Sequence, residues 1–172
     1  TFALLIGAAG AQPVVFVHRD YHSRNLMVTA ERSPGIIDFQ DAVAGPIGYD
    51  LVSLLKDCYI SWPRERVAAW LGAYREQLRA AGAGVGADPA EFRRWFDLAG
   101  LQRHLKVLGI FARLWYRDGK SGYLADLPLT LGYVRETAAR YDELARFSAW
   151  VERALVPNLA AANARVRAGM PA

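Results

Sequence analysis

The chain has 172 residues, of which 53% are hydrophobic and 22% are charged, and its formal net charge is +4. This length and composition are typical of about one globular domain with a proper core, and they exclude a disordered chain. The mild basic excess contains no run of five lysines or arginines, so nucleic-acid binding is not expected. Cys58 is the only cysteine, which excludes an internal disulfide and a cysteine-rich zinc site and favours the cytoplasm.

The first expected elements are a short helix and a strand. Residues 1–12 are mostly apolar and are followed by Pro13, so they read as the end of a core helix. This segment is far too short to cross a bilayer, and no membrane partner is expected. Residues 14–17 are β-branched and aromatic, which predicts a strand.

A polar loop is predicted between two short strands. Residues 18–24 are mostly polar and precede a second strand at residues 26–28. Residues 29–35 form a turn segment that ends in a Pro-Gly pair, and residues 36–37 then lead into Asp38. The pattern predicts a small hairpin-like β unit that presents the polar loop.

The remainder of the chain is predicted to be helical. Asp88 and Glu91 have the spacing of a capping box at a helix start. The glycine-rich residues 82–86 follow a helix rather than a strand and lack the lysine of a phosphate-binding loop, so they are expected to be a linker. The expected helices cover residues 49–58, 63–81, 88–116, 129–147 and 149–166, the last interrupted near Pro157. The fold class is therefore α+β, mostly helical, with a few short strands that carry the loop.

One group of polar residues lies in the predicted loop and directly after the strand that follows it. His18, Asp20 and Asn25 fit H-x-D-x-x-x-x-N, and Ile37-Asp38-Phe39 follows the turn. Together these motifs resemble the catalytic loop and the metal-binding D-F-G-like element of the protein-kinase fold. Phosphoryl transfer needs a carboxylate that orients the attacking hydroxyl, and Mg²⁺ takes carboxylate and amide oxygens as ligands. The alternative is a solvated polar loop with a capping Asp and Asn.

The sequence after Asp38 resembles one branch of the kinase-like proteins. Gln40 stands where protein kinases favour glycine, and a helix is expected so soon afterwards that an activation loop has no room. The segments at residues 38–41 and 45–51 are similar to the aminoglycoside-phosphotransferase superfamily. That resemblance implies a protein-kinase-like C-terminal lobe over residues 1–172, with ATP as the phosphate donor and Mg²⁺ as the cofactor.

Three longer stretches narrow the resemblance. They are similar to the amino-sugar kinases of peptidoglycan recycling. The stretches are HRDYHSRNLMV, IIDFQDAVAGPIGYDLVSLLKDCYISWP and LQRHLKVLGIFARLWYRDGK. This similarity implies ATP-dependent phosphorylation of the C1 hydroxyl of N-acetylmuramate or N-acetylglucosamine. An aminoglycoside or choline kinase is the alternative enzyme. The acceptors of such kinases are cations that call for an acidic pocket, and the arginine-rich residues 102–113 count against them.

The resemblance also assigns roles to the loop residues. Asp20 would be the catalytic base, and Asn25 and Asp38 would bind Mg²⁺. His22 stands where protein kinases place a lysine that contacts phosphate, and Arg24 is a second candidate for phosphate binding. Packing within the loop is an equally good explanation of His22, and simple solvation would explain Arg24.

Three further residues are expected to support the loop. His18 would hold it by hydrogen bonds. Asp50 begins a predicted helix, so capping is a sufficient explanation, while the resemblance implies that it braces the catalytic loop. Asp41 would be either a residue behind the metal site or a turn former.

Residues that would contact the acceptor are expected on a later helix. Gln102, Arg103 and His104 form a polar cluster in an otherwise aromatic helix, and Gln102 and Arg103 are the candidates for substrate binding. One helical turn presents only part of such a cluster to any one site, so at least one member is expected to be plain surface. Nearby aromatic side chains are more often core than sugar-stacking platforms.

The nucleotide-binding half of a kinase has no counterpart in these 172 residues. Lys56, Lys106 and Lys120 are the only lysines and all follow the predicted loop, so the strand lysine that holds the phosphates in kinases is not among them. We therefore expect a C-terminal lobe with little turnover alone, and an apolar face that a missing N-terminal lobe or a second chain covers. The alternative is a non-catalytic sugar-binding or interaction module derived from such a kinase.

Overall fold

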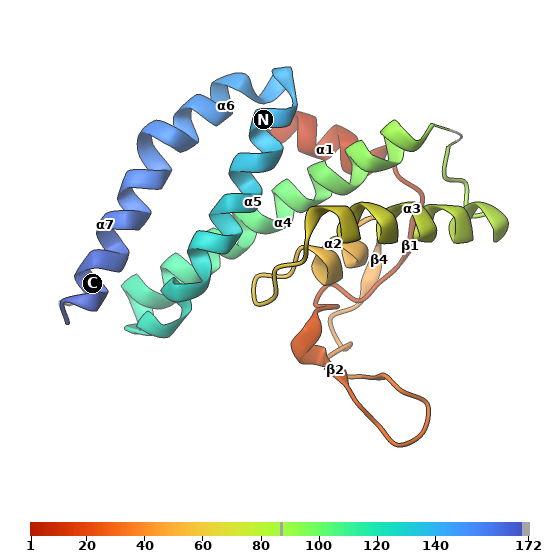
Figure 1. The fold of residues 1–172 in the computed structure, drawn as a ribbon, viewed down its shortest axis with the longest axis horizontal. Helices are drawn as coiled ribbons and strands as arrows, with labels where there is room; N and C mark the ends of the chain where they lie inside the picture. Colours follow the sequence, from red (N-terminus) through yellow and green to blue (C-terminus); the bar gives the residue numbers. More distant parts are fainter. Residues whose placement is uncertain (87, 170–172) are drawn as a thin grey trace. The chain divides into compact units, whose positions relative to one another are not determined.

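The computed structural model of the chain describes residues 1–86 and 88–169. The chain divides after Gly100 into two compact units, each described here by itself. Helices predominate in both units, and the few strands are short and antiparallel, so the predicted mostly helical α+β class is confirmed (Figure 1). None of the helices within the described residues is both long enough and apolar enough to cross a membrane.

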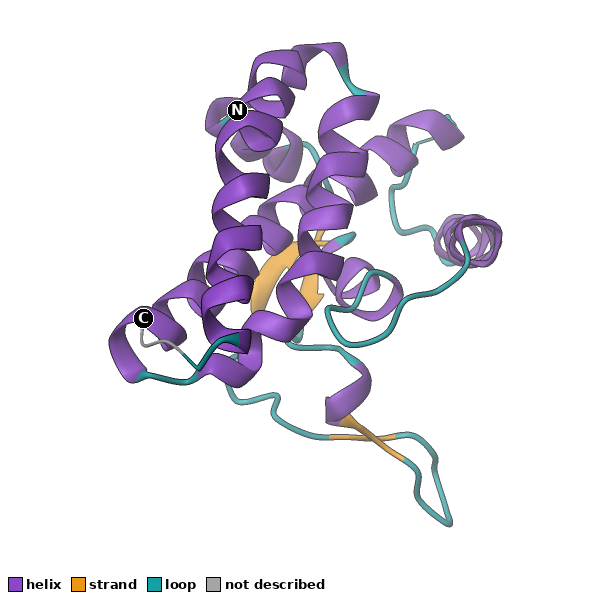
Figure 2. Cartoon of the chain, turned by 60° about the vertical axis from the view of Figure 1, so that its left-hand side comes forward, coloured by secondary structure: helices purple, strands orange, loops and turns teal. Residues whose placement is uncertain are grey.

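The N-terminal unit contains two separate β hairpin-like pairs, drawn in orange in Figure 2. The predicted helix end and first two strands are present as α1 (Phe2–Gly10), β1 (Val14–Val17) and β2 (Leu26–Met27). β2 pairs with β3 (Gly35–Ile36), and the loop between them extends away from the rest of this unit (Figure 1).

The partner of β1 is a strand that the sequence did not predict. β4 (Val43–Pro46) runs antiparallel to β1, with Val14 opposite Pro46 and Val17 opposite Val43. A segment with a glycine and a terminal proline has a weak strand signal, and its pairing comes from the partner strand rather than from local propensity. The 18–25 loop leaves the end of β1 and is followed by β2.

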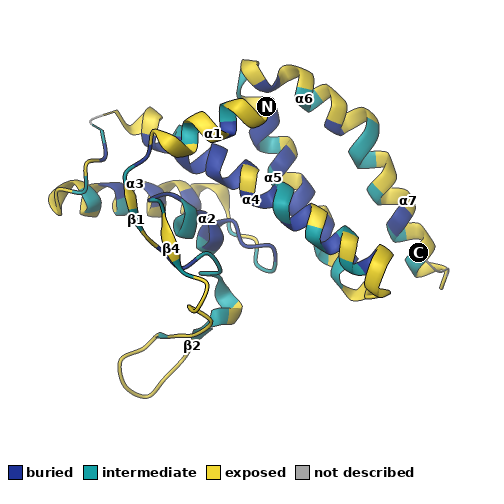
Figure 3. Cartoon of the chain, turned by 180° about the vertical axis from the view of Figure 1, so that it is seen from behind, coloured by how far each residue is buried: buried dark blue, intermediate teal, exposed yellow. Residues whose placement is uncertain are grey.

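Three helices complete the N-terminal unit. They are α2 (Tyr49–Leu55), α3 (Arg64–Ala80) and the first part of α4 (Pro89–Asp118). α2 ends earlier than the predicted residue 58, and α4 begins as predicted, with the Asp88 carboxylate accepting a hydrogen bond of 2.8 Å from the Ala90 amide. Figure 3 shows the buried face of these helices. Their core consists of Ile47, Val52, Leu55, Val67, Leu71, Val85, Phe92, Trp95, Phe96 and Ala99.

The C-terminal unit contains helices joined by short connections and no strand over its described residues. After α4 it contains η2 (Ser121–Asp126), α5 (Leu127–Arg140), η3 (Asp142–Leu144), α6 (Ala145–Trp150), the π-helical turn η4 (Val151–Leu155) and α7 (Val156–Arg167). The predicted single helix over residues 129–147 is wrong, because Tyr141 is extended with φ −119° and ends α5. The predicted irregularity near Pro157 is confirmed as the π-helical turn just before it, where a proline lacks the amide that the helix needs.

Candidate active site

The 18–25 loop has a tight and partly left-handed backbone. Arg19 has a φ of 78°, which is uncommon for a residue with a Cβ atom. The His22 amide donates to the Asp20 carbonyl over 3.0 Å, and the Asn25 amide donates to the His22 carbonyl over 2.9 Å. These short-range bonds fold residues 20–25 into consecutive turns that end in the 3₁₀ turn η1 (Ser23–Asn25).

Asp50, in the first turn of α2, braces the start of the loop. Its two carboxylate oxygens accept hydrogen bonds from the His18 amide at 2.6 Å and from the Arg19 amide at 3.0 Å. The N-cap position of α2 is Gly48, so the carboxylate serves the loop rather than the helix. Bonds of this kind to an ionised acceptor are about twice as strong as neutral ones, and they hold Arg19 in its unusual conformation.

His18 joins the loop to the segment that carries Asp38. Its side chain is only 3% exposed, and its Nε2 lies 3.0 Å from the Ile37 carbonyl oxygen. Because a carbonyl oxygen only accepts, Nε2 carries the proton in this hydrogen bond. The ring also contacts Tyr21 edge to face, with the ring centres 5.8 Å apart. His18 therefore positions the backbone on both sides of the site.

Asp20, Asn25 and Asp38 meet at this junction. The Asn25 side-chain amide donates to the Asp20 carbonyl at 2.9 Å and to the Asp38 carboxylate at 3.3 Å. The Gln40 side chain donates to the other oxygen of Asp38 at 2.8 Å. The Asp38 side chain is exposed, and its φ of 66° turns the chain sharply after Ile37.

The donor set at the junction fits Mg²⁺. Asp38 offers a carboxylate and Asn25 a carboxamide oxygen, both hard oxygen ligands. Across residues 1–86 and 88–169, no cluster of three or more His, Cys, Asp or Glu side chains is arranged to hold a metal ion. One or two protein ligands are enough for Mg²⁺, since water and substrate phosphates commonly complete its octahedral shell.

His22 and Arg24 both lie against Tyr59. The Arg24 guanidinium carbon is 3.5 Å from the centre of the Tyr59 ring, and the His22 ring meets Tyr59 edge to face at 5.7 Å. A guanidinium over an aromatic face is held by a cation–π interaction. Tyr59 therefore fixes both candidate phosphate-binding side chains. Asp41 contacts the loop through its backbone carbonyl, which accepts a hydrogen bond of 3.2 Å from the Arg19 guanidinium.

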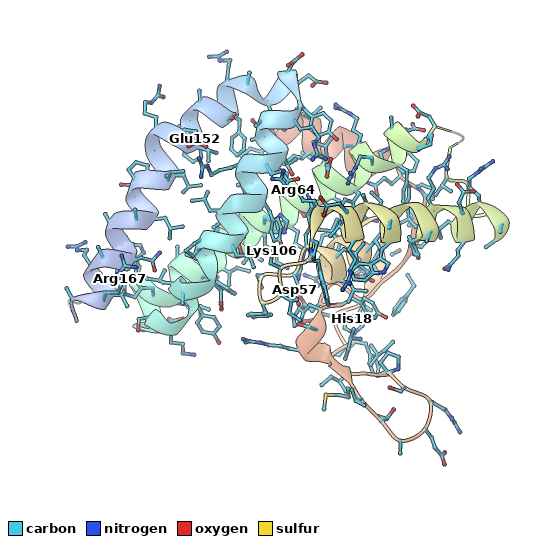
Figure 4. The ribbon with its side chains drawn as sticks, viewed as in Figure 1. His18, Asp57, Arg64, Lys106, Glu152 and Arg167 are labelled. Carbon is cyan, nitrogen blue, oxygen red and sulfur yellow. The ribbon has the colours of Figure 1, made fainter. Side chains whose placement is uncertain are left out.

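Asp57 is a second brace of the loop, and unlike the half-buried Asp50 it is fully buried and was not predicted from the sequence. Its side chain is 1% exposed, and one oxygen accepts hydrogen bonds from the Ser23 hydroxyl at 2.5 Å and the Ser23 amide at 3.1 Å. The other oxygen accepts from the Tyr59 amide at 3.1 Å. Figure 4 labels Asp57 close to the loop. The only signal in the sequence is an aspartate just past a helix end, which does not reveal a partner so far away in the chain.

A pocket of about 490 Å³ opens beside Asp57 within the N-terminal unit. Its walls come from the 18–25 loop, α2, residues 57–62 and α3. The residues that line it are Ser23, Leu51, Leu54, Leu55, Asp57, Ile60, Trp62, Trp70, Ala73, Tyr74 and Gln77. The sequence did not predict this pocket, because its walls are distant in the chain.

The predicted substrate residues Gln102 and Arg103 belong to the C-terminal unit. Gln102 is exposed, whereas Arg103 is 4% exposed and His104 is buried with its ring stacked on Tyr133 at 4.9 Å. The cluster is thus divided between the surface and the interior of this unit, as expected for neighbours on one helix.

A braced loop followed by an Asp–Asn pair of oxygen donors is an arrangement that phosphotransferases of the kinase type use. The chain belongs to the phosphotransferase enzyme family, whose model matches residues 3–95. The resemblance to the aminoglycoside-phosphotransferase superfamily is thereby confirmed.

Individual relatives carry a more specific name. The chain is 54% identical over 142 residues to the N-acetylmuramate/N-acetylglucosamine kinase of Pseudomonas putida, covering 83% of this chain and 42% of that protein. It is 56% identical over 135 residues to the kinase of that name from Neisseria meningitidis, covering 78% and 40%. The Caulobacter vibrioides protein of that name is 36% identical over 147 residues, covering 83% and 39%. The chain thus spans less than half the length of these curated relatives.

Proposed function

We propose that the full-length protein is an ATP-dependent kinase that phosphorylates the anomeric hydroxyl of N-acetylmuramate or N-acetylglucosamine. The observation that carries the proposal is the meeting of Asp20, Asn25 and Asp38 beside a loop held by Asp50. The choice of acceptor is supported by the names of relatives that are 50–56% identical to this chain. Such a reaction would serve peptidoglycan recycling in the cytoplasm, where ATP is available.

The proposed chemistry is a displacement at the γ-phosphorus of ATP. Asp20 orients the sugar hydroxyl and accepts its proton while the oxygen–phosphorus bond forms and the bond to ADP breaks. Asp38 and Asn25 would hold Mg²⁺, which supplies positive charge to the phosphate oxygens when bound. His22 and Arg24, fixed on Tyr59, would bind the transferred phosphate.

The support of the site has a physical purpose in this proposal. Phosphoryl transfer depends on positioning and on charges that are already in place, so a loop that moved would lose most of the rate. Asp50 and His18 hold the start of the 18–25 loop, and Asp57 holds its end through Ser23. Asp41 would act through its backbone, as a turn former beside Arg19.

We also propose that a further part of the full-length protein, or a second chain, covers an apolar surface of the N-terminal unit. Phe2 and Ile6 in α1, Val14 and Phe16 in β1, and Val43 in β4 are all exposed (Figure 3). Large exposed apolar patches mark interaction surfaces. The covering part would supply the lysine and the glycine-rich loop that hold ATP in kinases.

The test is ATP- and Mg²⁺-dependent phosphorylation of the two sugars by the full-length protein, beside an Asp20→Asn variant. We expect product phosphorylated at C1 and a loss of kcat of roughly 100-fold or more in the variant, the usual range for a general base. Phosphorylation of an aminoglycoside or of choline, and of neither sugar, would contradict the proposed acceptor. Sugar binding without any phosphorylation, under conditions where ATP and Mg²⁺ bind, would favour a non-catalytic module.

A further inference from the structure

The pocket beside Asp57 has the size and enclosure of a small-molecule site. Its volume of about 490 Å³ lies within the usual range of roughly 300–1,000 Å³ for ligand pockets. Its walls belong to elements whose positions are fixed by the core of the N-terminal unit, since Leu55 in α2 and Leu71 in α3 are both buried in that core. The pocket is therefore formed before any ligand arrives.

The walls of the pocket are mainly apolar, and two of them are flat. The rings of Trp62 and Trp70 meet edge to face at 85° with their centres 5.2 Å apart, which makes a corner of two aromatic side chains. The Arg66 guanidinium lies 5.6 Å from the Trp70 ring and helps to hold it. A ligand with compact apolar parts, such as a methyl group or the C–H face of a ring, would fit this corner.

The polar groups of the pocket are few and carry no positive charge. Among the described residues that line it, side-chain hydrogen-bonding groups come only from Ser23, Asp57, Tyr74, Gln77 and the indole N–H groups of Trp62 and Trp70. Asp57 adds a buried carboxylate. A carboxylate or phosphate placed here would lose its water and face the like charge of Asp57, which is unfavourable without a paired cation. The pocket therefore selects a neutral ligand.

The pocket also reaches the 18–25 loop. Ser23 is in its wall and lies three residues from Asp20, a separation that even fully extended chain limits to about 11 Å. On another wall, burial raises the pKa of Tyr74 above its ordinary value, and the negative charge of Asp50 raises it further. Ser23 therefore joins the wall of this pocket to the loop that carries Asp20.

We propose that this pocket binds the neutral, N-acetylated part of the acceptor sugar, with the acetamido methyl group against Trp62 and Trp70. The reacting hydroxyl then points to Asp20, and any acidic substituent of the sugar lies outside the pocket. The proposal rests on the proposed kinase function and adds the residues that select the acceptor. Tyr74 and Gln77 provide the hydrogen bonds to the amide or to a ring hydroxyl.

The experiment fills the pocket and measures each substrate separately in the full-length protein. Ala73→Trp places a large side chain on an exposed wall position of α3, where the helix backbone is not disturbed. We expect the KM for N-acetylglucosamine to rise at least 10-fold, while the KM for ATP and the melting temperature change little. Trp70→Ala should raise the KM for N-acetylglucosamine more than that for glucose, because glucose has no acetamido group.

Trp150→Ala is the matched control for Trp70→Ala, since Trp150 is a similarly exposed tryptophan in α6. It should leave both KM values unchanged. An Ala73→Trp variant that phosphorylates N-acetylglucosamine with an unchanged KM would overturn the pocket proposal and leave the kinase proposal standing. If the natural protein phosphorylates no sugar, calorimetric titration with N-acetylglucosamine measures whether the sugar binds in the pocket. Binding by the natural protein that is lost in the Ala73→Trp variant supports the pocket proposal. Equal binding by the two proteins, or no binding by either, overturns it.

Discussion

The two units of the chain hold their charged side chains in different ways. In the N-terminal unit, Asp50 and Asp57 accept hydrogen bonds from loop residues 32 and 34 positions away, largely out of water. In the C-terminal unit, the ion pair between Arg135 and Glu152 joins exposed side chains of α5 and η4. Long-range bonds to carboxylates that are half-buried or buried fix a loop in one geometry, whereas exposed pairs join helices whose apolar faces already define the packing.

This difference is consistent with where the chemistry is proposed to occur. A buried carboxylate without its partners costs free energy, so evolution retains it where geometry must be exact to a fraction of an ångström. The N-terminal unit carries two such braces beside the 18–25 loop. Substitutions that remove buried partners should therefore have large effects, and substitutions of exposed pairs should have small ones.

The largest expected effect on stability is at a buried ion pair of the N-terminal unit. The Lys56 ammonium lies 3.4 Å from the Asp97 carboxylate, and the two side chains are 6% and 0% exposed. Lys56→Met leaves Asp97 buried without this ammonium and should cost about 3–5 kcal/mol, measured by urea denaturation. The double variant Lys56→Met/Asp97→Leu should recover much of the loss. A single variant as stable as the natural protein would contradict the importance of buried partners.

Next in size is Asp50→Ala, which removes two charge-assisted hydrogen bonds to the loop backbone. Since each such bond contributes roughly 1.5–3 kcal/mol, we expect a loss of about 3 kcal/mol and a fall in kcat of at least 10-fold. Asp142→Ala, at an exposed position of η3, is the control and should change stability by less than about 0.5 kcal/mol. Normal turnover in Asp50→Ala would show that the loop does not need this brace.

Ser23→Ala should have a smaller effect. It removes the hydroxyl bond to Asp57 and keeps the bond from the Ser23 amide. We expect a loss of about 1–2 kcal/mol and a reduction in kcat that is smaller than that of Asp50→Ala. Thermal unfolding and steady-state kinetics of the two variants, side by side, test this ranking. A larger loss of activity in Ser23→Ala would reverse the order of the two braces.

Tyr74 should make the stability of the N-terminal unit depend on pH in the alkaline range. Burial raises the pKa of Tyr74, so the unfolded chain releases this proton before the folded one does. Above about pH 10 the folded state then binds more protons than the unfolded state, and the free energy of unfolding falls as pH rises. Comparing urea midpoints of the natural protein and Tyr74→Phe across this range isolates the contribution. Parallel curves for the two proteins would contradict it.

The smallest expected effect is at the exposed pair of the C-terminal unit. The Glu152 carboxylate accepts a hydrogen bond from Arg135 and raises its pKa, yet both side chains are largely in water. Arg135→Gln should shift the unfolding midpoint only slightly, and the shift should shrink further in high salt. A loss comparable to that of Lys56→Met would remove the contrast between the two units.

The 18–25 loop could be predicted because its residues are close together in the chain. The spacing of His18, Asp20 and Asn25 and the short strands on either side are local features, and the strands are present in the structure. The roles of these residues stay predictions. Asp57 was missed because its bonds to the loop arise only when residues 34 positions apart in the chain meet. Asp57 also lies in the segment where the sequence predicted that α2 would continue, beyond its actual end at Leu55.

Helix ends away from the loop were harder to predict. Tyr141 interrupts a stretch of good helix formers without a glycine or proline to mark the break, so the sequence favoured a single helix there. At residue 148, between two predicted helices, the chain stays helical, whereas the irregularity predicted near Pro157 is present as the π-helical turn at Val151–Leu155. Tertiary packing decides such ends when local propensity is uniform.

The left-handed backbone of Arg19 has a consequence for evolutionary change. With a φ of 78°, position 19 tolerates glycine, asparagine or aspartate far better than valine or isoleucine, whatever the chemistry of the side chain. In relatives with another residue at this position, we therefore expect the left-handed backbone, rather than the charge of the side chain, to limit which residues occur. A collection of functional variants would show β-branched residues depleted at position 19, even if many polar replacements survive.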